Sequence, residues 1–196
     1  STITMEGQGK PFNGDTHMQD EFLRLKKKHG IERVIETGTF HGDTTAWLSD
    51  NFDFVRTIEF DRTRQNLSLR KLRGRANVEL FNGDSSKDLA KMLKGFTDKL
   101  LIFLDAHWFA NPVLAELKQI AEAGITPVLA IHDFYNPNDP TMGFDQYPDQ
   151  GIKYEYSWIE PSLKSIYGDN FAFHYNKVAT GARRGCIFVY PKKSAK

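Results

Sequence analysis

The chain has 196 residues, 40% of them hydrophobic, which suffices for one well-buried core and leaves too little for two domains. We therefore expect a single domain over residues 1–196. Because 26 lysines and arginines nearly balance 25 aspartates and glutamates, no global field favours nucleic acid or an anionic membrane, and a small molecule is the expected partner.

Apolar runs of strand length alternate along the chain with segments of helical period, which is the pattern of a parallel α/β sheet. Residues 1–15 are polar and glycine-rich, and they form either a flexible arm or a flap over the site. The pattern predicts helices at 16–29, 43–50, 62–72, 86–93, 112–123 and 161–167. It predicts strands at 33–37, 54–60, 77–81, 100–104, 127–131, 171–175 and 185–190, the last two as an antiparallel hairpin.

A long segment rich in Pro, Asp, Asn and Gly, residues 133–150, is expected to be a loop, and loops of this length usually carry function. With the residues that follow, it predicts a substrate-side lid over 133–160. Aromatic residues near it form either an acceptor pocket or plain core and lid packing. They are Trp108, Phe109, Phe134, Tyr135, Phe144, Tyr147, Tyr154, Tyr156 and Trp158.

The basic segment 62–75 is the strongest signal for nucleic acid. Its apolar residues Leu67, Leu69 and Leu72 fit one flank of a helix, so its charges are more simply a solvated face. Arg183 and Arg184, near the last hairpin turn, either bind a phosphate or protect a sheet edge.

The lone cysteine, Cys186, excludes an intrachain disulfide and a cysteine-based zinc site, and its apolar neighbours predict a packing role. No apolar stretch approaches the ~20 residues of a membrane span, and the N-terminus has no signal-peptide core. We therefore expect a cytoplasmic protein without a membrane partner.

Residues 34–45 read Val-Ile-Glu-Thr-Gly-Thr-Phe-His-Gly-Asp-Thr-Thr, so an acid and two glycines join a β-branched strand to a helix. Gly38 and Gly42 let the backbone pass close to a ligand where amide groups and the helix dipole favour polar or anionic groups. The spacing Glu-x-Gly-x-x-x-Gly lacks the third glycine of dinucleotide-binding turns, which disfavours a nicotinamide-dependent oxidoreductase.

Three acids follow the first three predicted strands. Glu36 ends the first strand, and Glu59 ends the second, 21 residues after Gly38, where a carboxylate can accept hydrogen bonds from both ribose hydroxyls. Asp84 follows the third strand, where it either meets a ligand or, with Ser85, caps the next helix. Open α/β sheets bind their ligands at this edge.

A second group follows the fourth and fifth strands, in Phe-Leu-Asp105-Ala-His107-Trp and Ile-His132-Asp133-Phe. The two aspartates are 28 residues apart, about one βαβ unit, so neighbouring strands would turn both carboxylates to one crevice. Paired carboxylates suit Mg²⁺, Ca²⁺ or Mn²⁺, and a histidine shifts the preference toward Mn, Fe or Zn. His107 and His132 are candidate proton acceptors or hydrogen-bonded structural residues.

The first motif and its next acid resemble those of class I S-adenosylmethionine-dependent methyltransferases. The second group resembles metal-dependent small-molecule O-methyltransferases: Phe-Leu-Asp-Ala-His-Trp is similar to catechol O-methyltransferases, and the His-Asp pair to macrocin and cephalosporin-pathway enzymes. Two positions depart from the catechol pattern, because Phe134 stands at an Asn ligand position and no Lys follows Trp108.

The resemblance implies a Rossmann-like seven-stranded sheet, mostly parallel with an antiparallel C-terminal strand and helices on both faces. It implies S-adenosylmethionine bound by Glu36, Gly38, Thr39, His41, Gly42, Thr44, Glu59, Asp84, Ser85 and Asp105. It further implies catalytic roles for Asp105, His107 and His132, and Mg²⁺ or Mn²⁺ held by Asp105, His132 and Asp133.

These features predict methyl transfer to a hydroxyl of a small molecule or sugar. The alternatives are a catalytically degenerate adenosylmethionine-binding protein and, less favoured, a nucleic-acid methyltransferase. A homodimer is one option for the assembly.

Overall fold

The structure is a computed structural model, and it describes residues 9–106 and 111–192. The expected site residue His107 and the aromatic residues Trp108 and Phe109 lie outside the described residues. The helices are η1 (Pro11–Gly14), α1 (Thr16–His29), α2 (Asp43–Asn51), α3 (Arg62–Leu72), α4 (Ser85–Met92), α5 (Val113–Ala123), η2 (Pro148–Gln150) and α6 (Tyr156–Tyr167). The strands are β1 (Arg33–Thr37), β2 (Phe54–Glu59), β3 (Val78–Asn82), β4 (Leu100–Leu104), β5 (Val128–His132), β6 (Gln146–Tyr147), β7 (Ile152–Lys153), β8 (Phe171–Tyr175) and β9 (Cys186–Pro191).

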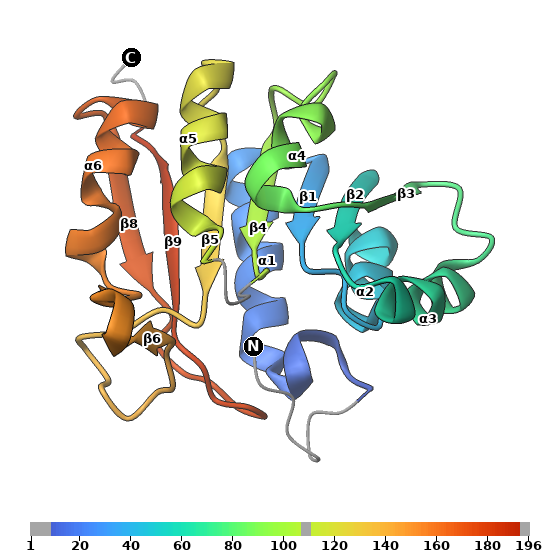
Figure 1. Cartoon of the computed structure of the whole chain (residues 1–196), viewed down its shortest axis with the longest axis horizontal. Coiled ribbons are helices and arrows are strands. Elements are labelled where there is room, and N and C mark those ends of the chain that lie inside the picture. Colours follow the sequence, from blue (N-terminus) through green and yellow to red (C-terminus); the bar gives the residue numbers. More distant parts are fainter. Residues whose placement is uncertain (1–8, 107–110, 193–196) are drawn as a thin grey trace.

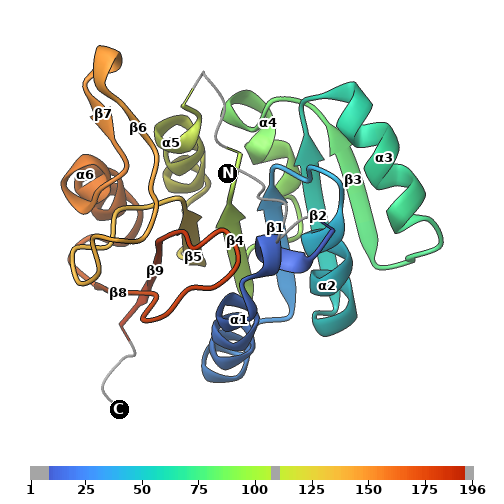
Figure 2. The same ribbon diagram turned by 90° about the horizontal axis from the view of Figure 1, so that it is seen from below.

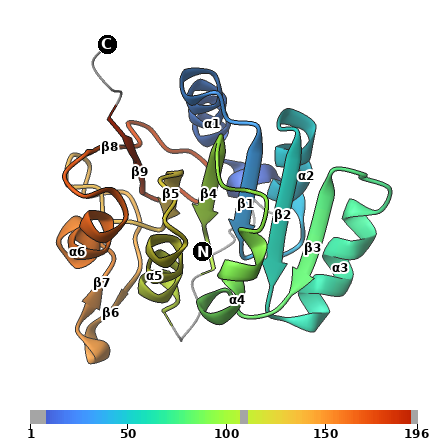
Figure 3. The same cartoon turned by 90° about the horizontal axis from the view of Figure 1, so that it is seen from above.

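One seven-stranded sheet of order β3-β2-β1-β4-β5-β9-β8 forms the centre of the molecule (Figure 1). Strands β1 to β5 are parallel to one another, and β9 is antiparallel to both β5 and β8. Helices α1 and α2 lie on one face and α4, α5 and α6 on the other (Figures 2 and 3). The predicted fold class, including the C-terminal hairpin, is confirmed.

The core consists of two apolar clusters, one on each face of the sheet, because successive side chains of a strand point to opposite faces. In β1, Val34 packs with the cluster under α1 and α2, while Ile35 packs with the one under α4, α5 and α6. All five residues of β4 are buried, as a central parallel strand covered on both faces requires. The carboxyl ends of β1, β2, β4 and β5 therefore meet at one edge, and this edge positions the site.

Helix α6 begins five residues before the predicted start at Pro161, which lies inside the helix. Proline lacks the N–H group for a mid-helix hydrogen bond, so sequence reasoning placed it in the first turn. Tertiary packing outweighs this cost, because Ile159 is fully buried and Trp158 stacks on Tyr154 at 4.9 Å between ring centroids.

The expected long loop 133–150 is not entirely irregular. It contributes β6, which pairs with β7 in a separate antiparallel hairpin. Phe134, Met142 and Tyr154 are buried, so core packing explains Phe134 and Tyr154 among the predicted aromatic residues. Movement of this segment as a lid stays a prediction.

The predicted apolar flank of α3 is wrong for two of its three leucines. Leu67 and Leu69 are exposed, and the buried residues are Ser68 and Leu72. The reason is the close approach of α3 to Gly42, where an added Cβ would lie 3.3 Å from the Ser68 side chain. Several cations of the basic segment have partners within the chain: Lys71 pairs with Asp43, and Arg75 with Asp50.

Cys186 is fully buried, as a packing role requires, and burial raises the pKa of its thiol. Among the described helices, none combines the length and apolar character needed to cross a membrane.

Candidate functional site

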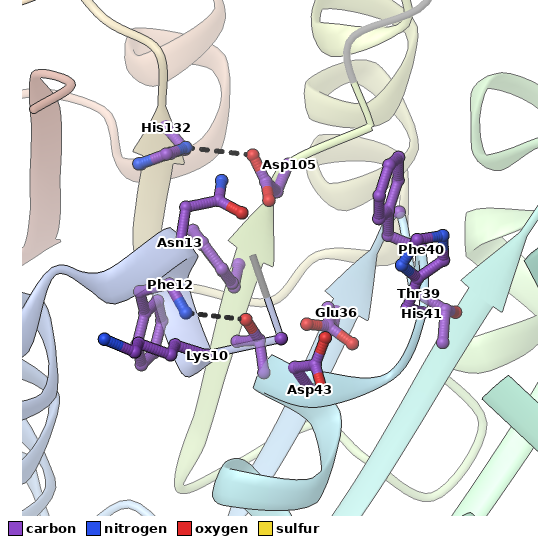
Figure 4. Close-up of a pocket in the computed structure, with 14 residues that line it drawn as sticks. Lys10, Phe12, Asn13, Glu36, Thr39, Phe40, His41, Asp43, Asp105 and His132 are labelled. Carbon is purple, nitrogen blue, oxygen red and sulfur yellow. Dashed lines mark hydrogen bonds and ion pairs between the residues drawn. The ribbon is translucent and has the colours of Figure 1, made fainter. Parts of the chain in front are cut away.

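A cleft opens at the carboxyl edge of the sheet, where β1, β4 and β5 end (Figure 4). It is lined by Gly9, Lys10, Phe12, Asn13, Glu36, Gly38, Thr39, Phe40, His41, Asp43, Thr44, Phe103, Asp105 and His132. Seven of the predicted site residues are in this set: Glu36, Gly38, Thr39, His41, Thr44, Asp105 and His132. Strands far apart in sequence thus bring the glycine motif and the Asp-His group to one cleft.

Both glycines of the turn donate a backbone hydrogen bond, Gly38 to the Ile58 carbonyl at 2.9 Å and Gly42 to the Thr39 carbonyl at 2.9 Å. Gly38 has φ +81°, and an added Cβ would lie 2.7 Å from the backbone oxygen of Asp105, so only glycine fits beside the end of β4. Gly42, with φ +87°, begins α2 without a side-chain cap. No side chain caps the first amide groups of α2, which leaves them able to donate to a polar or anionic group.

Glu36 is almost fully buried under the cleft. Its Oε1 accepts hydrogen bonds from Thr57 Oγ1 at 2.7 Å and from Thr45 Oγ1. Burial raises the pKa of Glu36 to about 8, with a smaller contribution from Asp105, while the two hydroxyl groups oppose the shift. The carboxyl group is therefore mostly protonated at pH 7 and would ionise when a cation binds beside it.

Glu59 is buried and fixes the glycine turn from β2. One carboxylate oxygen accepts from the Phe40 N–H at 2.7 Å and the other from the Asp61 N–H at 2.9 Å. Burial raises the pKa of Glu59, and these two backbone donors oppose the rise. Glu59 does not line the cleft. Its predicted contact with a ribose would require the carboxylate to accept hydrogen bonds from the ribose and from the Phe40 N–H at the same time.

Asp84 acts as the cap of α4. Its Oδ1 accepts from the Ser86 N–H at 3.0 Å and from the Ser86 hydroxyl at 2.7 Å. Neither Asp84 nor Ser85 lines the cleft, and Ser85 is buried. Of the two readings of Asp84, the structure shows the helix cap, and a cofactor contact stays a prediction.

Asp105 follows β4 and is held in place by β1. Thr37 Oγ1 accepts hydrogen bonds from the Asp105 N–H at 3.1 Å and from the Ala106 N–H at 3.2 Å. The end of β4 is thereby clamped against Gly38, and the Asp105 side chain is directed into the cleft (Figure 4).

Asp105, His132 and Asp133 form one charged cluster. His132 Nδ1 lies 3.0 Å from Asp105 Oδ1 and 3.5 Å from Asp133 Oδ1. Burial lowers the pKa of His132, but Asp133 and Asp105 outweigh it and raise the pKa to about 10. The two neighbouring carboxyl groups therefore favour the protonated imidazole, and in that form His132 cannot accept a proton.

Arg184 reaches this cluster from the chain just before β9, and neither of its two predicted roles describes it. Its Nε donates to Asp133 Oδ1 at 2.6 Å, and its Nη2 contacts Asp145 Oδ1. The guanidinium group therefore ties the segment 133–150 to β9 and compensates the fully buried Asp133 carboxylate. The sequence contains no spacing signal for this contact between Arg184 and Asp133, which are 51 residues apart.

The N-terminal segment contributes a wall of the cleft that sequence reasoning did not resolve. Phe12 is buried against Phe22 and Phe103, at ring-centroid distances of 4.8 and 5.7 Å, and its N–H donates to Thr44 Oγ1 at 2.9 Å. Asn13 lines the cleft beside it (Figure 4). The one local signal is Pro-Phe-Asn-Gly, a turn sequence with a single large apolar residue.

The donor atoms of this cluster are of the kinds that bind divalent metal ions. One imidazole nitrogen and two carboxylate oxygens lie within 4.8 Å of one another, and such a mixed donor set favours Mn²⁺ over Mg²⁺. Asp133 is the least available of the three ligands, because its Oδ1 already accepts a hydrogen bond from Arg184.

No protein-family model and no curated protein sequence matches this chain. Solved structures of methyltransferases do match. TomG is an O-methyltransferase from Streptomyces achromogenes that is involved in tomaymycin synthesis and was solved with SAM. Its sequence is 19% identical to this chain, the match covers 90% of this chain and 80% of TomG, and the TM-score is 0.60. The methyltransferase domain of bacterial CtHen1-C is 11% identical, covering 91% and 98%, with a TM-score of 0.61. The N-terminal domain of EvdMO1, solved in the presence of SAH and D-fucose, is 16% identical, covering 89% and 82%, with a TM-score of 0.58.

These identities are low, and the similarity is one of architecture over most of each chain. The chain therefore has the Rossmann-like methyltransferase fold that the sequence predicted. The fold by itself does not select an acceptor.

Proposed function

We propose that this protein transfers a methyl group from S-adenosylmethionine to a hydroxyl group of a small molecule or sugar. The observation that carries the proposal is the meeting of the glycine turn with Asp105 and His132 in one cleft of a methyltransferase fold, with Asp133 buried behind them. TomG and EvdMO1, which were solved with SAM or SAH, support the cofactor assignment, and the D-fucose used with EvdMO1 supports a sugar-like acceptor.

The cleft offers a complementary group for each charged group of the methionine part of the cofactor. The uncapped N-terminus of α2 suits a carboxylate, and the buried Glu36 suits an ammonium group, whose approach would favour ionisation of the carboxyl. Bound S-adenosylmethionine would supply an electrophilic methyl group. Glu36, Glu59 and the glycine turn orient the cofactor, directly or by holding the Phe40 backbone.

Asp105 is the member of the cluster that the acceptor can reach. Its side chain is 19% exposed, against 4% for His132 and 0% for Asp133. In the transfer, a C–O bond forms as the C–S bond breaks, and Asp105 takes the hydroxyl proton directly or through a water molecule. Asp105, His132 and Asp133 would hold a divalent ion, which lowers the pKa of a coordinated hydroxyl group.

Calorimetric titration of metal-stripped protein with S-adenosylmethionine, with and without Mn²⁺, tests the cofactor and metal assignments. We expect micromolar cofactor binding, and an Mn²⁺ heat that Asp105→Asn abolishes. The matched control is Asp98→Asn, which removes an exposed carboxylate before β4 that pairs with Arg33 at the surface.

A panel of hydroxylated acceptors, followed by mass spectrometry, then tests turnover. A methylated product lost in Asp105→Asn supports the enzyme. Cofactor binding with no product from any acceptor would favour the degenerate binding protein. Absence of cofactor binding would refute the proposal and direct attention to nucleotides and NADH.

A further inference from the structure

Strand β8 is the last strand of the sheet, and its outer edge carries backbone groups ready for pairing. The Asn176 N–H donates to the Cys186 carbonyl at 3.1 Å, and the Lys192 N–H donates to the Asn170 carbonyl at 3.3 Å. Along an antiparallel strand, the N–H and C=O groups of successive residues point to opposite edges, so the even-numbered residues of β8 direct theirs toward β9. Phe171, Phe173 and Tyr175 therefore direct their N–H and C=O groups outward, and no other described strand pairs with them.

The strand also lacks the charged residues and prolines that protect many sheet edges. Its sequence, Phe-Ala-Phe-His-Tyr, contains no lysine, proline or acid. On the α6 side, Phe173 stacks on Tyr156 at 4.4 Å and meets Tyr175 at 5.9 Å between ring centroids, while 36% of Phe173 remains exposed. An apolar, unpaired edge of this kind is a site for strand addition.

We propose that a second copy of this chain occupies this edge and pairs with β8 in antiparallel orientation about a twofold axis at Phe173. Phe173 then lies opposite the partner's Phe173, and Phe171 lies opposite the partner's Tyr175. Each of these pairs exchanges two backbone hydrogen bonds, because all three residues direct their groups outward. The aromatic rings on the α6 side form cross-strand pairs across the axis.

The charged residues that flank β8 favour this antiparallel pairing over a parallel one. The same register places Asp169 beside the partner's Lys177, and the twofold axis repeats the contact, as an isologous interface requires. Both residues are exposed and lie two positions beyond the ends of β8. A parallel pairing in register would instead place Asp169 beside the partner's Asp169 and Lys177 beside the partner's Lys177, so like charges would meet at both ends.

A charge-swap series measured by analytical ultracentrifugation at low salt tests the register. We expect the wild-type chain to dimerise, and Lys177→Asp and Asp169→Lys each to raise the dimer dissociation constant about tenfold. The double variant restores the pairing and should return the constant to within about threefold of wild type. Lys118→Asp on α5, whose side chain is 77% exposed, serves as the matched control and should change nothing.

Crosslinking through the twofold axis provides a second test. Phe173→Cys places a thiol opposite its own copy, at the ~5.5 Å Cα separation of a hydrogen-bonded pair, which a disulfide spans. Cys186 is fully buried and does not compete. We expect a reducible covalent dimer on oxidation, and none from Leu114→Cys on the exposed side of α5.

A chain that remains monomeric at hundreds of micromolar would overturn the proposal. So would a dimer whose dissociation constant is indifferent to the charge swaps, since its interface would lie elsewhere. Thermal unfolding of each variant, followed by circular dichroism, separates loss of pairing from loss of folding. The proposal is independent of the catalytic function, and none of its variants touches the cleft.

Discussion

Replacing Glu36 with glutamine tests the charge state of the acid beneath the cleft. The substitution keeps the shape of the side chain and makes it permanently neutral. Thr45 and Thr57 both donate to Oε1, so the amide oxygen of glutamine can accept both hydrogen bonds. The structure therefore predicts little local rearrangement, and the measured effect isolates the cost of ionisation.

The magnitude follows from the pKa. Glu36 has a pKa of about 8 in the folded chain against an ordinary value of 4.5. Between these values the folded state retains a proton that the unfolded state has lost, so stability falls as pH rises through this window. At about 1.4 kcal/mol per unit, the wild-type chain loses about 3 kcal/mol by pH 7 and about 4 kcal/mol by pH 8, where half of the folded-state carboxyl groups have already ionised.

Glu36→Gln has no such loss, so its stability advantage should grow from near zero at pH 4.5 to about 3 kcal/mol at pH 7. Urea unfolding at a series of pH values measures it, with Glu122→Gln, an exposed side chain on α5, as the control. The same variant should bind S-adenosylmethionine at least tenfold more weakly, because a neutral amide cannot pair with the ammonium group. Parallel pH profiles for wild type and variant would refute the reasoning, since Glu36 would then ionise normally.

Three further substitutions test other contacts of the site. Glu59→Ala removes the acceptor of the Phe40 and Asp61 amides and should weaken cofactor binding by about 1–3 kcal/mol in calorimetry; an unchanged affinity would exclude Glu59 from the site. Asp133→Ala removes one of the two carboxylates that pair with Arg184, which should cost about 3 kcal/mol in urea unfolding and abolish any metal dependence; activity that survives this change and EDTA would rule out the metal. Phe12→Ala should cost about 3–5 kcal/mol in urea unfolding, whereas unchanged stability would mean that the N-terminal segment is not packed.

Much of the fold could be predicted from local pattern. The predicted segments 33–37, 62–72 and 100–104 coincide with β1, α3 and β4, because strand runs and helix caps are local signals. The predictions that failed involve competition between local preference and packing. Pro161 lies inside α6 because burial of Ile159 outweighs a lost hydrogen bond, and Leu67 is exposed because α3 approaches Gly42 through Ser68.

The amino-acid sequence by itself determined the order of strands and helices, the glycine turn, and the set of acids placed at strand ends, since each depends on neighbours along the chain. Only the tertiary structure decided what those acids contact. Glu59 holds the Phe40 amide, 19 residues away, and Asp133 pairs with Arg184, 51 residues away, and both contacts need strands that lie side by side. Asp84 is the exception, because its cap of α4 is a contact with Ser86, two residues along the chain. Contacts between residues distant in sequence depend on sheet order and side-chain direction, and a one-dimensional pattern does not encode these.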